Sequence, residues 1–206
     1  MSPSGRALTR PFFARPSPVV APDLLGRVLV RRLPSGERLA ARIVETEAYQ
    51  EDDPASHSYR GRTARTDVMF RAPGHLYVYF TYGMHFCMNV VTGDDGEGSA
   101  VLLRAAEPLD GLQTMRRLRG TGEERLLCSG PARLAQAMGI GREHNGLDLV
   151  RRGELWIGQG APVATDRIVA TTRIGIRQGT DRPWRFLVGG DGFVSRAPAA
   201  TGSRRS

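Results

Sequence analysis

Residues 37–49 read ERLAARIVETEAY and predict a long β-strand. Branched and aromatic side chains favour extended backbone, and successive side chains of a strand point to opposite faces. The two-residue period places Ile43, Glu45, Glu47 and Tyr49 on one face. Two carboxylates on an apolar-flanked strand are unusual, so this strand is also a candidate for chemistry.

The segments on either side of this strand predict further strands and a few helices. Strands are predicted at residues 27–33, 75–91 with a tight turn at Tyr82-Gly83, 100–106, 147–150, 155–157, 167–176 and 184–188. Helices are predicted at residues 18–25, 109–119 and 131–138. The prediction is a single α+β domain over residues 10–195 with a largely antiparallel sheet. Residues 1–9 and 196–206 have few apolar side chains and predict mobile tails.

Every basic residue of this chain is an arginine. Its 206 residues include 29 basic and 21 acidic ones, which give a net charge of +8, and no lysine occurs. A domain this basic favours polyanions, because arginine binds phosphate in a fork and displaces counterions. From charge alone, a nucleic-acid partner and a solvated basic face without a partner are about equal alternatives. Without lysine, no side-chain amine is present to form a Schiff base.

Several classes of protein are excluded by what the sequence lacks. It has no run of ~20 apolar residues, so no membrane span is expected, and residues 1–10 lack the apolar centre of a signal peptide. Cys87 and Cys128 are its only cysteines, which excludes a disulfide scaffold. His57, His75 and His85 do not have the spacing of metal ligands, so no metal or other cofactor is expected. A reducing, cytoplasmic setting fits these observations.

All five tyrosines lie within residues 49–82, a window that also holds His57 and His75. Buried phenols need hydrogen-bond partners, and an ordinary core prefers aliphatic residues. The cluster therefore indicates either a stacking pocket or a half-exposed sheet face on which tyrosine is simply a good strand residue. Glu47 beside Tyr49 is a candidate general acid or base in such a pocket, while a solvent-facing or arginine-paired carboxylate is the alternative.

Four motifs of the sequence belong together: RIVETEAY at residues 42–49, ASHS at 55–58, PGHLYVYFTYGMHFCMN at 73–89 and VLLRAAEPL at 101–109. Together they resemble the alkyladenine (3-methyladenine) DNA glycosylase family of mammals and many bacteria. They occur in the family's order with similar separations, and the likeness extends from about Leu24 to Gly189. The helical pattern of the helix-hairpin-helix alkylation glycosylases is absent.

The resemblance implies a fold, a reaction and a partner. The implied fold is one compact α+β domain around a curved, largely antiparallel sheet with flanking helices, like the C-terminal domain of methionyl-tRNA formyltransferases. The implied reaction is base-excision repair: alkylated or deaminated purines are flipped out of duplex DNA and their N-glycosidic bond is hydrolysed. The implied partner is double-stranded DNA carrying damaged purines. No cofactor, no membrane association and no obligate protein partner are expected. The protein is expected to be a monomer in the cytoplasm, associated with the nucleoid through DNA binding.

The resemblance also implies roles for residues at the bond that is cut. Glu47 matches the general base that activates the attacking water. His57 matches a residue that holds this water and lines the base pocket, and Arg104 matches another that contacts the water or the adjacent phosphate. Tyr82 matches the side chain that enters the duplex and fills the vacated space, which would offset lost stacking.

Further residues match the family's pocket for the extruded base. Tyr49 and Tyr79, with His57, would sandwich the purine. Asn89 matches the residue that rejects the 2-amino group of guanine, and Leu102 with Asn89 would set the pocket width. Met69 and Tyr77 resemble further contacts along the DNA.

The absence of lysine bears on what happens after the base is released. An imine-forming strand cleavage would have to use the N-terminal amine, which is remote in sequence from the motifs. A monofunctional glycosylase that leaves an intact abasic site is therefore expected. Two alternatives to the enzyme remain: a non-catalytic module that binds damaged nucleic acid, which would tolerate loss of Glu47, and a hydrolase of free nucleosides, whose activity would not depend on salt.

Overall fold

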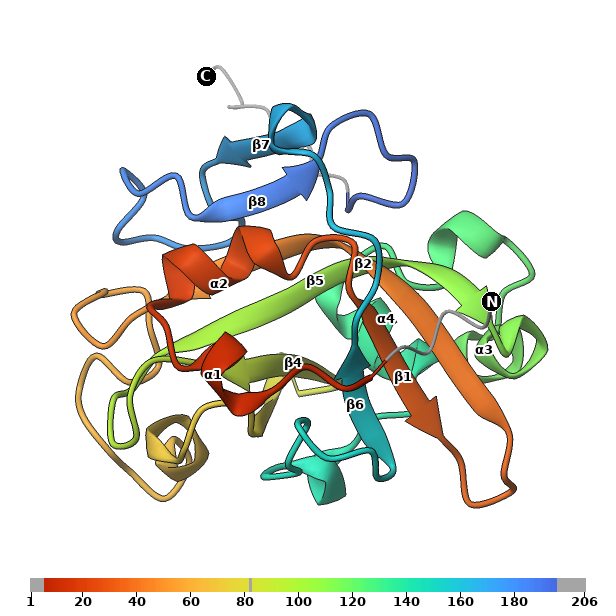
Figure 1. Cartoon of the computed structure of the whole chain (residues 1–206), viewed down its shortest axis with the longest axis horizontal. Coiled ribbons are helices and arrows are strands. Elements are labelled where there is room, and N and C mark those ends of the chain that lie inside the picture. Colours follow the sequence, from red (N-terminus) through yellow and green to blue (C-terminus); the bar gives the residue numbers. More distant parts are fainter. Residues whose placement is uncertain (1–5, 82, 196–206) are drawn as a thin grey trace, which may run out of the picture.

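A computed structural model describes residues 6–81 and 83–195, in which eight strands form one sheet (Figure 1). The strands are β1 (Val28–Arg32), β2 (Arg38–Tyr49), β3 (Leu76–Thr81), β4 (His85–Val91), β5 (Ala100–Asp110), β6 (Leu155–Gly158), β7 (Ile168–Thr171) and β8 (Arg185–Val188). Their order is β3-β4-β5-β2-β1-β6, β8 pairs with β2 and β7, and each of these pairings is antiparallel. The predicted α+β domain with an antiparallel sheet is confirmed.

Strand β2 is the centre of this sheet because it changes partner along its length. Its first half pairs with β1, Glu45–Glu47 pairs with β8, and its other edge pairs with β5 from Ala40 to Tyr49. The register with β5 shifts between Ala40 and Ala41 and again around Val44. Such bulges bend a strand and increase its twist. The sheet therefore curls around β2, and one of its concave regions holds the site described below.

Short helices cover both faces of the sheet. They are α1 (Arg10–Phe13), α2 (Ser17–Asp23), α3 (Leu112–Arg119) and α4 (Pro131–Ala137), with 3-10 turns η1 (Asp67–Phe70), η2 (Glu124–Leu126), η3 (Arg142–His144) and η4 (Thr165–Arg167). In Figure 1, α1 and α2 lie in front of the sheet and α4 lies behind it, against β4 and β5. The Thr46 hydroxyl donates to the Ala21 carbonyl of α2 (2.9 Å). The neighbouring side chains of Glu45 and Glu47 therefore point away from α2.

The main hydrophobic core fills the spaces between the sheet and these helices. Its members come from nearly every element and include Leu24, Leu29, Leu39, Ile43, Leu76, Met88, Leu103 and Met115, all fully buried. Burial of this kind supplies most of the free energy of folding, at roughly 25 cal/mol for each Å² of apolar surface. The core fixes the positions of β2 to β5, from which most of the site residues project.

Three predicted elements differ from the structure. Residues 147–150 form no strand, because Asp148 makes only one isolated bridge, to His75, and its carboxylate accepts the Val150 N–H in a turn. The predicted strand at 167–176 ends at Thr171, where the chain turns inward. The predicted helix at 109–119 begins at Leu112, since β5 continues to Asp110.

The N-terminal boundary of the packed structure lies earlier than residue 10. Ala7 forms a bridge to Gly158, the Leu8 N–H donates to the Ile157 carbonyl (2.8 Å), and the Leu8 side chain is buried. Residues 6–9 are therefore packed against β6 rather than part of a tail. The rest of the predicted tails, residues 1–5 and 196–206, and Tyr82 lie outside the described residues.

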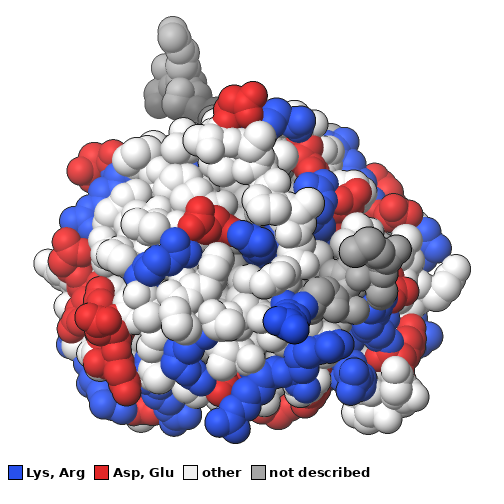
Figure 2. Space-filling view, viewed as in Figure 1, with Lys and Arg blue, Asp and Glu red and all other residues white. Residues whose placement is uncertain are grey.

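The surface that carries α1 and α2 has arginine and acidic side chains interleaved (Figure 2). Arg15, between these helices, pairs with Asp23 at 2.8 Å. The basic charge of this face is thus partly neutralised by its neighbours. None of the helices in the described segments has the length and apolar character that crossing a membrane requires.

Candidate active site

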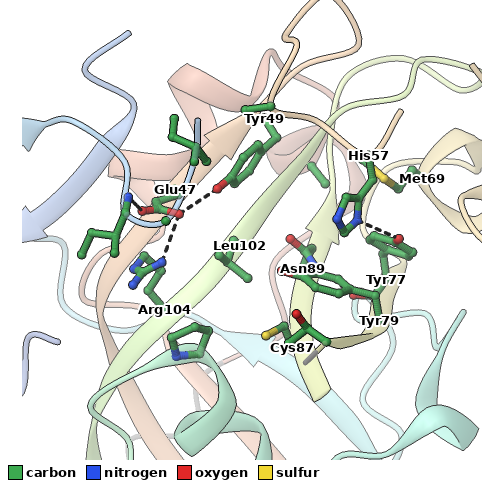
Figure 3. Close-up of a pocket in the computed structure, with 17 residues that line it drawn as sticks. Glu47, Tyr49, His57, Met69, Tyr77, Tyr79, Cys87, Asn89, Leu102 and Arg104 are labelled. Carbon is green, nitrogen blue, oxygen red and sulfur yellow. Dashed lines mark hydrogen bonds and ion pairs between the residues drawn. The ribbon is translucent and has the colours of Figure 1, made fainter. Parts of the chain in front are cut away.

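A cavity of about 390 Å³ opens on the face of β2 that points away from α2 (Figure 3). Ligand pockets commonly have volumes of roughly 300–1,000 Å³. Strands β2 to β5 contribute most of the lining, and the rest comes from the loop after β2, the start of α4 at Pro131 and residues 174–176. These segments are far apart in the sequence, and the curl of the sheet brings them together.

Glu47 is fully buried at one end of this cavity. Its Oε2 accepts the Tyr49 hydroxyl (2.9 Å) and Arg104 Nη1 (3.2 Å), and its Oε1 accepts the backbone N–H of Ile174 (2.8 Å). A carboxylate has about four acceptor positions, so these three donors leave one open. Glu47 is therefore a fixed, oriented carboxylate that can still accept a proton or hydrogen bond from the cavity.

Arg104 holds Glu47 together with a second carboxylate, that of Glu45. Arg104 Nε lies 3.0 Å from Glu45 Oε1, which also accepts Arg185 Nε at 2.7 Å. The backbone N–H of Ser195 donates to Glu45 Oε2 (2.7 Å). Burial by itself lowers the pKa of Arg104, but the charges of Glu47 and Glu45 outweigh this and leave the pKa raised. Arg104 is thus a permanent cation. Together, Arg104 and Arg185 supply two positive charges next to the carboxylates of Glu45 and Glu47.

His57 lies at the rim of the cavity, with part of its ring open to solvent. A hydrogen bond joins its Nδ1 to the Tyr77 hydroxyl (3.1 Å), and its ring meets that of Tyr79 edge-on, with 4.5 Å between centres. Desolvation by the surrounding atoms, followed by the charge of Arg65, lowers the pKa of His57 below its usual value of 6.5. At neutral pH the imidazole is therefore uncharged.

Tyrosine rings form the two walls of a slot. Figure 3 shows Tyr49 on one side and Tyr79, with His57, on the other. Burial raises the pKa of both phenols, and for Tyr49 the charge of Glu47 raises it further. Both hydroxyls therefore stay protonated, and the walls are uncharged aromatic surfaces.

The floor of the slot consists of residues from β4 and β5. Asn89 and Leu102 are cross-strand partners and both are buried. The Asn89 amide donates from Nδ2 to the Tyr77 carbonyl (3.2 Å), which fixes its orientation. Cys87 lies beside Tyr79, and burial raises the pKa of its thiol. A protonated thiol and a fixed amide make this floor uncharged as well.

Met69 and Tyr77 lie in the wall of the cavity. The resemblance implies that they are further contacts along the DNA, and in the structure they are 2% and 1% exposed. Tyr77 packs against Tyr79 with 5.7 Å between ring centres. Both residues line the same cavity as Glu47 and Tyr49.

The structure thus brings nine of the ten predicted site residues together, and the tenth, Tyr82, lies outside the described residues. It adds residues that sequence reasoning missed. Ile174 supplies a backbone donor, and Arg173 and Asp53 form a buried ion pair next to Tyr49. A backbone donor leaves no trace in the residue type, so no local pattern could have identified Ile174. In the described residues, no three His, Cys, Asp or Glu side chains are grouped as metal ligands.

Known proteins with similar sequences indicate the class of enzyme and the family to which this chain belongs. The family model described as methylpurine-DNA glycosylase matches residues 11–192. A relative from Carboxydothermus hydrogenoformans is 52% identical over 189 residues, which cover 92% of this chain and 98% of the relative. A relative from Burkholderia lata is 50% identical, over 93% of this chain and 92% of the relative. A relative from Streptomyces avermitilis is 48% identical, over 99% of this chain and 98% of the relative. The names of all three contain "3-methyladenine DNA glycosylase".

The fold, the buried carboxylate and these matches define a DNA glycosylase, a hydrolase of the N-glycosidic bond that acts in DNA repair. The chain belongs to the methylpurine-DNA glycosylase family.

Proposed function

We propose that this enzyme binds duplex DNA, takes an alkylated or deaminated purine into the slot and hydrolyses its N-glycosidic bond, leaving the strand uncut. The observation that carries the proposal is the buried Glu47 carboxylate, fixed by Tyr49, Arg104 and Ile174 at the end of an aromatic slot. The substrates are 3-methyladenine, 7-methylguanine, hypoxanthine, ethenoadenine and related purines.

Glu47 acts as the general base. Its open acceptor position takes a proton from a water molecule, the water oxygen bonds to C1′ of the sugar, and the base leaves with the electron pair of the glycosidic bond. The transition state resembles an oxocarbenium ion, which a nearby carboxylate stabilises. Arg104 holds the Glu47 carboxylate in place, and His57 helps to hold the water at the rim of the cavity.

The aromatic slot selects the base. Tyr49 stacks on one face of the flipped purine, and Tyr79 with His57 contacts the other. An alkylated purine carries a positive charge, which uncharged aromatic faces attract, so the neutral His57 favours this class. Asn89 and Leu102 limit the width of the floor, and the fixed Asn89 amide clashes with the 2-amino group of unmodified guanine and so rejects the normal base. 7-methylguanine carries the same amino group, but its positive charge makes it a better leaving group. Met69 and Tyr77, in the wall of the cavity, make further contacts with the DNA.

The duplex lies over the arginines around the cavity mouth. Arg65 is exposed next to Tyr77 and His57, and in the described part of the chain the exposed Arg60 and Arg177 have no acidic partner. Arginines without acidic partners bind phosphate more readily than paired ones. Tyr82, in the connection between β3 and β4, enters the duplex and replaces the extruded base. No lysine is present for strand cleavage, so the product is an intact abasic site.

The test is single-turnover release of free base from duplexes that carry hypoxanthine or a methylated purine. Glu47→Gln keeps the size of the side chain and removes the base, so release slows by about 100-fold or more while duplex binding remains. The control is Glu123→Gln, which changes an exposed glutamate and leaves the rate unchanged. If the wild-type protein binds the duplexes and releases no base from any lesion, it is a damage-binding module and the proposal is wrong.

A further inference from the structure

Arg173 is a fully buried arginine that the reaction outlined above does not use. It follows β7, at the point where the chain turns inward, and its guanidinium forms a forked ion pair with the equally buried Asp53 carboxylate (Nη2 to Oδ1, 3.0 Å). It also donates to the Ala48 carbonyl (2.9 Å) and the Gly179 carbonyl (3.0 Å). One side chain thus joins the end of β2, the loop after β2 and the segment of residues 172–183.

These contacts lie directly behind the cavity. The Arg173 guanidinium is 4.7 Å from the centre of the Tyr49 ring, so it supports one wall of the slot. The next residue, Ile174, donates its backbone N–H to Glu47 Oε1. Any displacement of Arg173 therefore moves both a wall of the slot and a hydrogen-bond donor of the general base.

Stability alone does not account for a buried ion pair of this kind. Removing two charges from water costs free energy that their attraction often only offsets, and apolar residues of similar volume serve stability equally well. What apolar residues cannot do is hold three separate segments in one geometry by directional hydrogen bonds. The guanidinium fork does this because its donors lie in a fixed plane.

We propose that Arg173 is a positioning residue for base excision, which with Asp53 holds the Ile174 amide against Glu47 and the Tyr49 ring against the flipped base. This inference rests on the proposed function of Glu47. Arg173 acts through these neighbours and does not itself touch the substrate.

The test compares Arg173→Lys with the wild-type enzyme in single-turnover excision over a range of enzyme concentrations. Lysine keeps the charge but cannot bind Asp53 and both carbonyls at once. A displacement of about 1 Å can reduce a rate about 100-fold, so the maximum rate falls by about 10- to 100-fold while the half-saturating concentration is unchanged. Asp53→Asn weakens the same fork from its other side and gives the same pattern.

A neighbouring ion pair supplies a matched control. Arg182 pairs with the exposed Asp52 (3.2 Å) and packs on Trp184, so it braces the same segment from outside without reaching Glu47 or Tyr49. Arg182→Lys and Asp52→Asn leave the maximum rate at the wild-type value.

A purely structural role for Arg173 would give a different result. Partial unfolding reduces the concentration of active enzyme, which raises the apparent half-saturating concentration and leaves the maximum rate unchanged. That result in both Arg173→Lys and Asp53→Asn would overturn this inference and leave the proposed function standing. If the wild-type enzyme itself releases no base, the proposed function fails and this inference fails with it.

Discussion

His57 is partly exposed and is uncharged at neutral pH. Its charge state predicts how the stability of the folded protein changes as the pH falls. The pKa of His57 is lowered in the folded protein, by desolvation first and by Arg65 second, so the folded state resists its protonation. The unfolded chain takes up the proton near pH 6.5, the usual value. Since the unfolded state then binds more protons, the stability that His57 contributes is complete above about pH 6.5 and decreases as pH falls toward the lower folded-state pKa.

Urea unfolding of wild-type protein and His57→Gln at several pH values between 7.5 and 5 measures this effect. Below pH 6.5 the free energy of unfolding should fall less steeply in the variant, by a slope equivalent to less than one proton because part of the ring is in water. Identical slopes in the two proteins would show that folding does not change the protonation of His57.

Glu47 and Arg104 show what the strand pattern predicts at the scale of a residue and what it does not. The site role of Arg104 follows from the resemblance to the family and not from the strand pattern. The two-residue period correctly places Glu47 with Tyr49, and Leu102 with Arg104, on shared faces. Their other partners could not be predicted in this way. Glu45 is hydrogen-bonded to Ser195, 150 residues later, and no local period relates positions so far apart.

At the scale of elements, the beginning of β1 depends on a close backbone contact at Gly26. This glycine has φ +81°, and a Cβ built on it would lie 2.1 Å from the Ala161 carbonyl oxygen. The segment after β6 crosses over β1 at this point, and the Gly26 N–H donates to the Ile43 carbonyl of β2 (2.8 Å). A side chain here must displace either the crossing segment or the strand pair.

Gly26→Ala should therefore lower the free energy of unfolding by more than the ~1–3 kcal/mol that a strained backbone conformation costs by itself. For a chain of this size each 1 kcal/mol corresponds to a Tm decrease of roughly 2–4 °C. The control is Gly36→Ala, which has a similar φ of +85° but no atom within 4 Å of the added carbon. Equal Tm values for the two variants, measured by thermal denaturation, would mean that the contact with Ala161 is not important.

The strands around the site were predictable because alternation and turn residues are local signals. The predicted segments 37–49 and 75–91 match β2 and the β3–β4 pair closely. The segment 167–176 also has branched residues, but its second half leaves the sheet because Arg173 pairs with Asp53 inside the protein. A residue-by-residue period contains no information about such a distant partner, so the prediction of a continuous strand was wrong there.

At the scale of the whole molecule, the distribution of charge says more about how the protein binds DNA than the net charge of +8 does. Many arginines have local acidic partners: Arg15 pairs with Asp23 on the α1–α2 side, and Arg62 and Arg71 share Asp67 in the loop after β2. Ion pairs of this kind leave less free charge for a polyanion. The exposed Arg60 and Arg177 have no acidic partner in the described segments. We therefore expect these two arginines to contribute more to the proposed phosphate binding than an average share of the net charge would.

Salt dependence of duplex binding separates the arginines around the cavity from those elsewhere on the surface. Each phosphate contact contributes about 0.9 to the slope of log affinity against log salt concentration, because each contact releases a counterion. Arg60→Gln and Arg177→Gln should each reduce that slope by about 1 and weaken binding to damaged and undamaged duplexes alike. Arg152→Gln is the control. Arg152 packs on Trp156 of β6, at the opposite edge of the sheet from β3, so the slope for this variant should equal the wild-type value. If all three variants reduce the slope equally, DNA is attracted by the overall charge of the molecule and not by the arginines around the cavity.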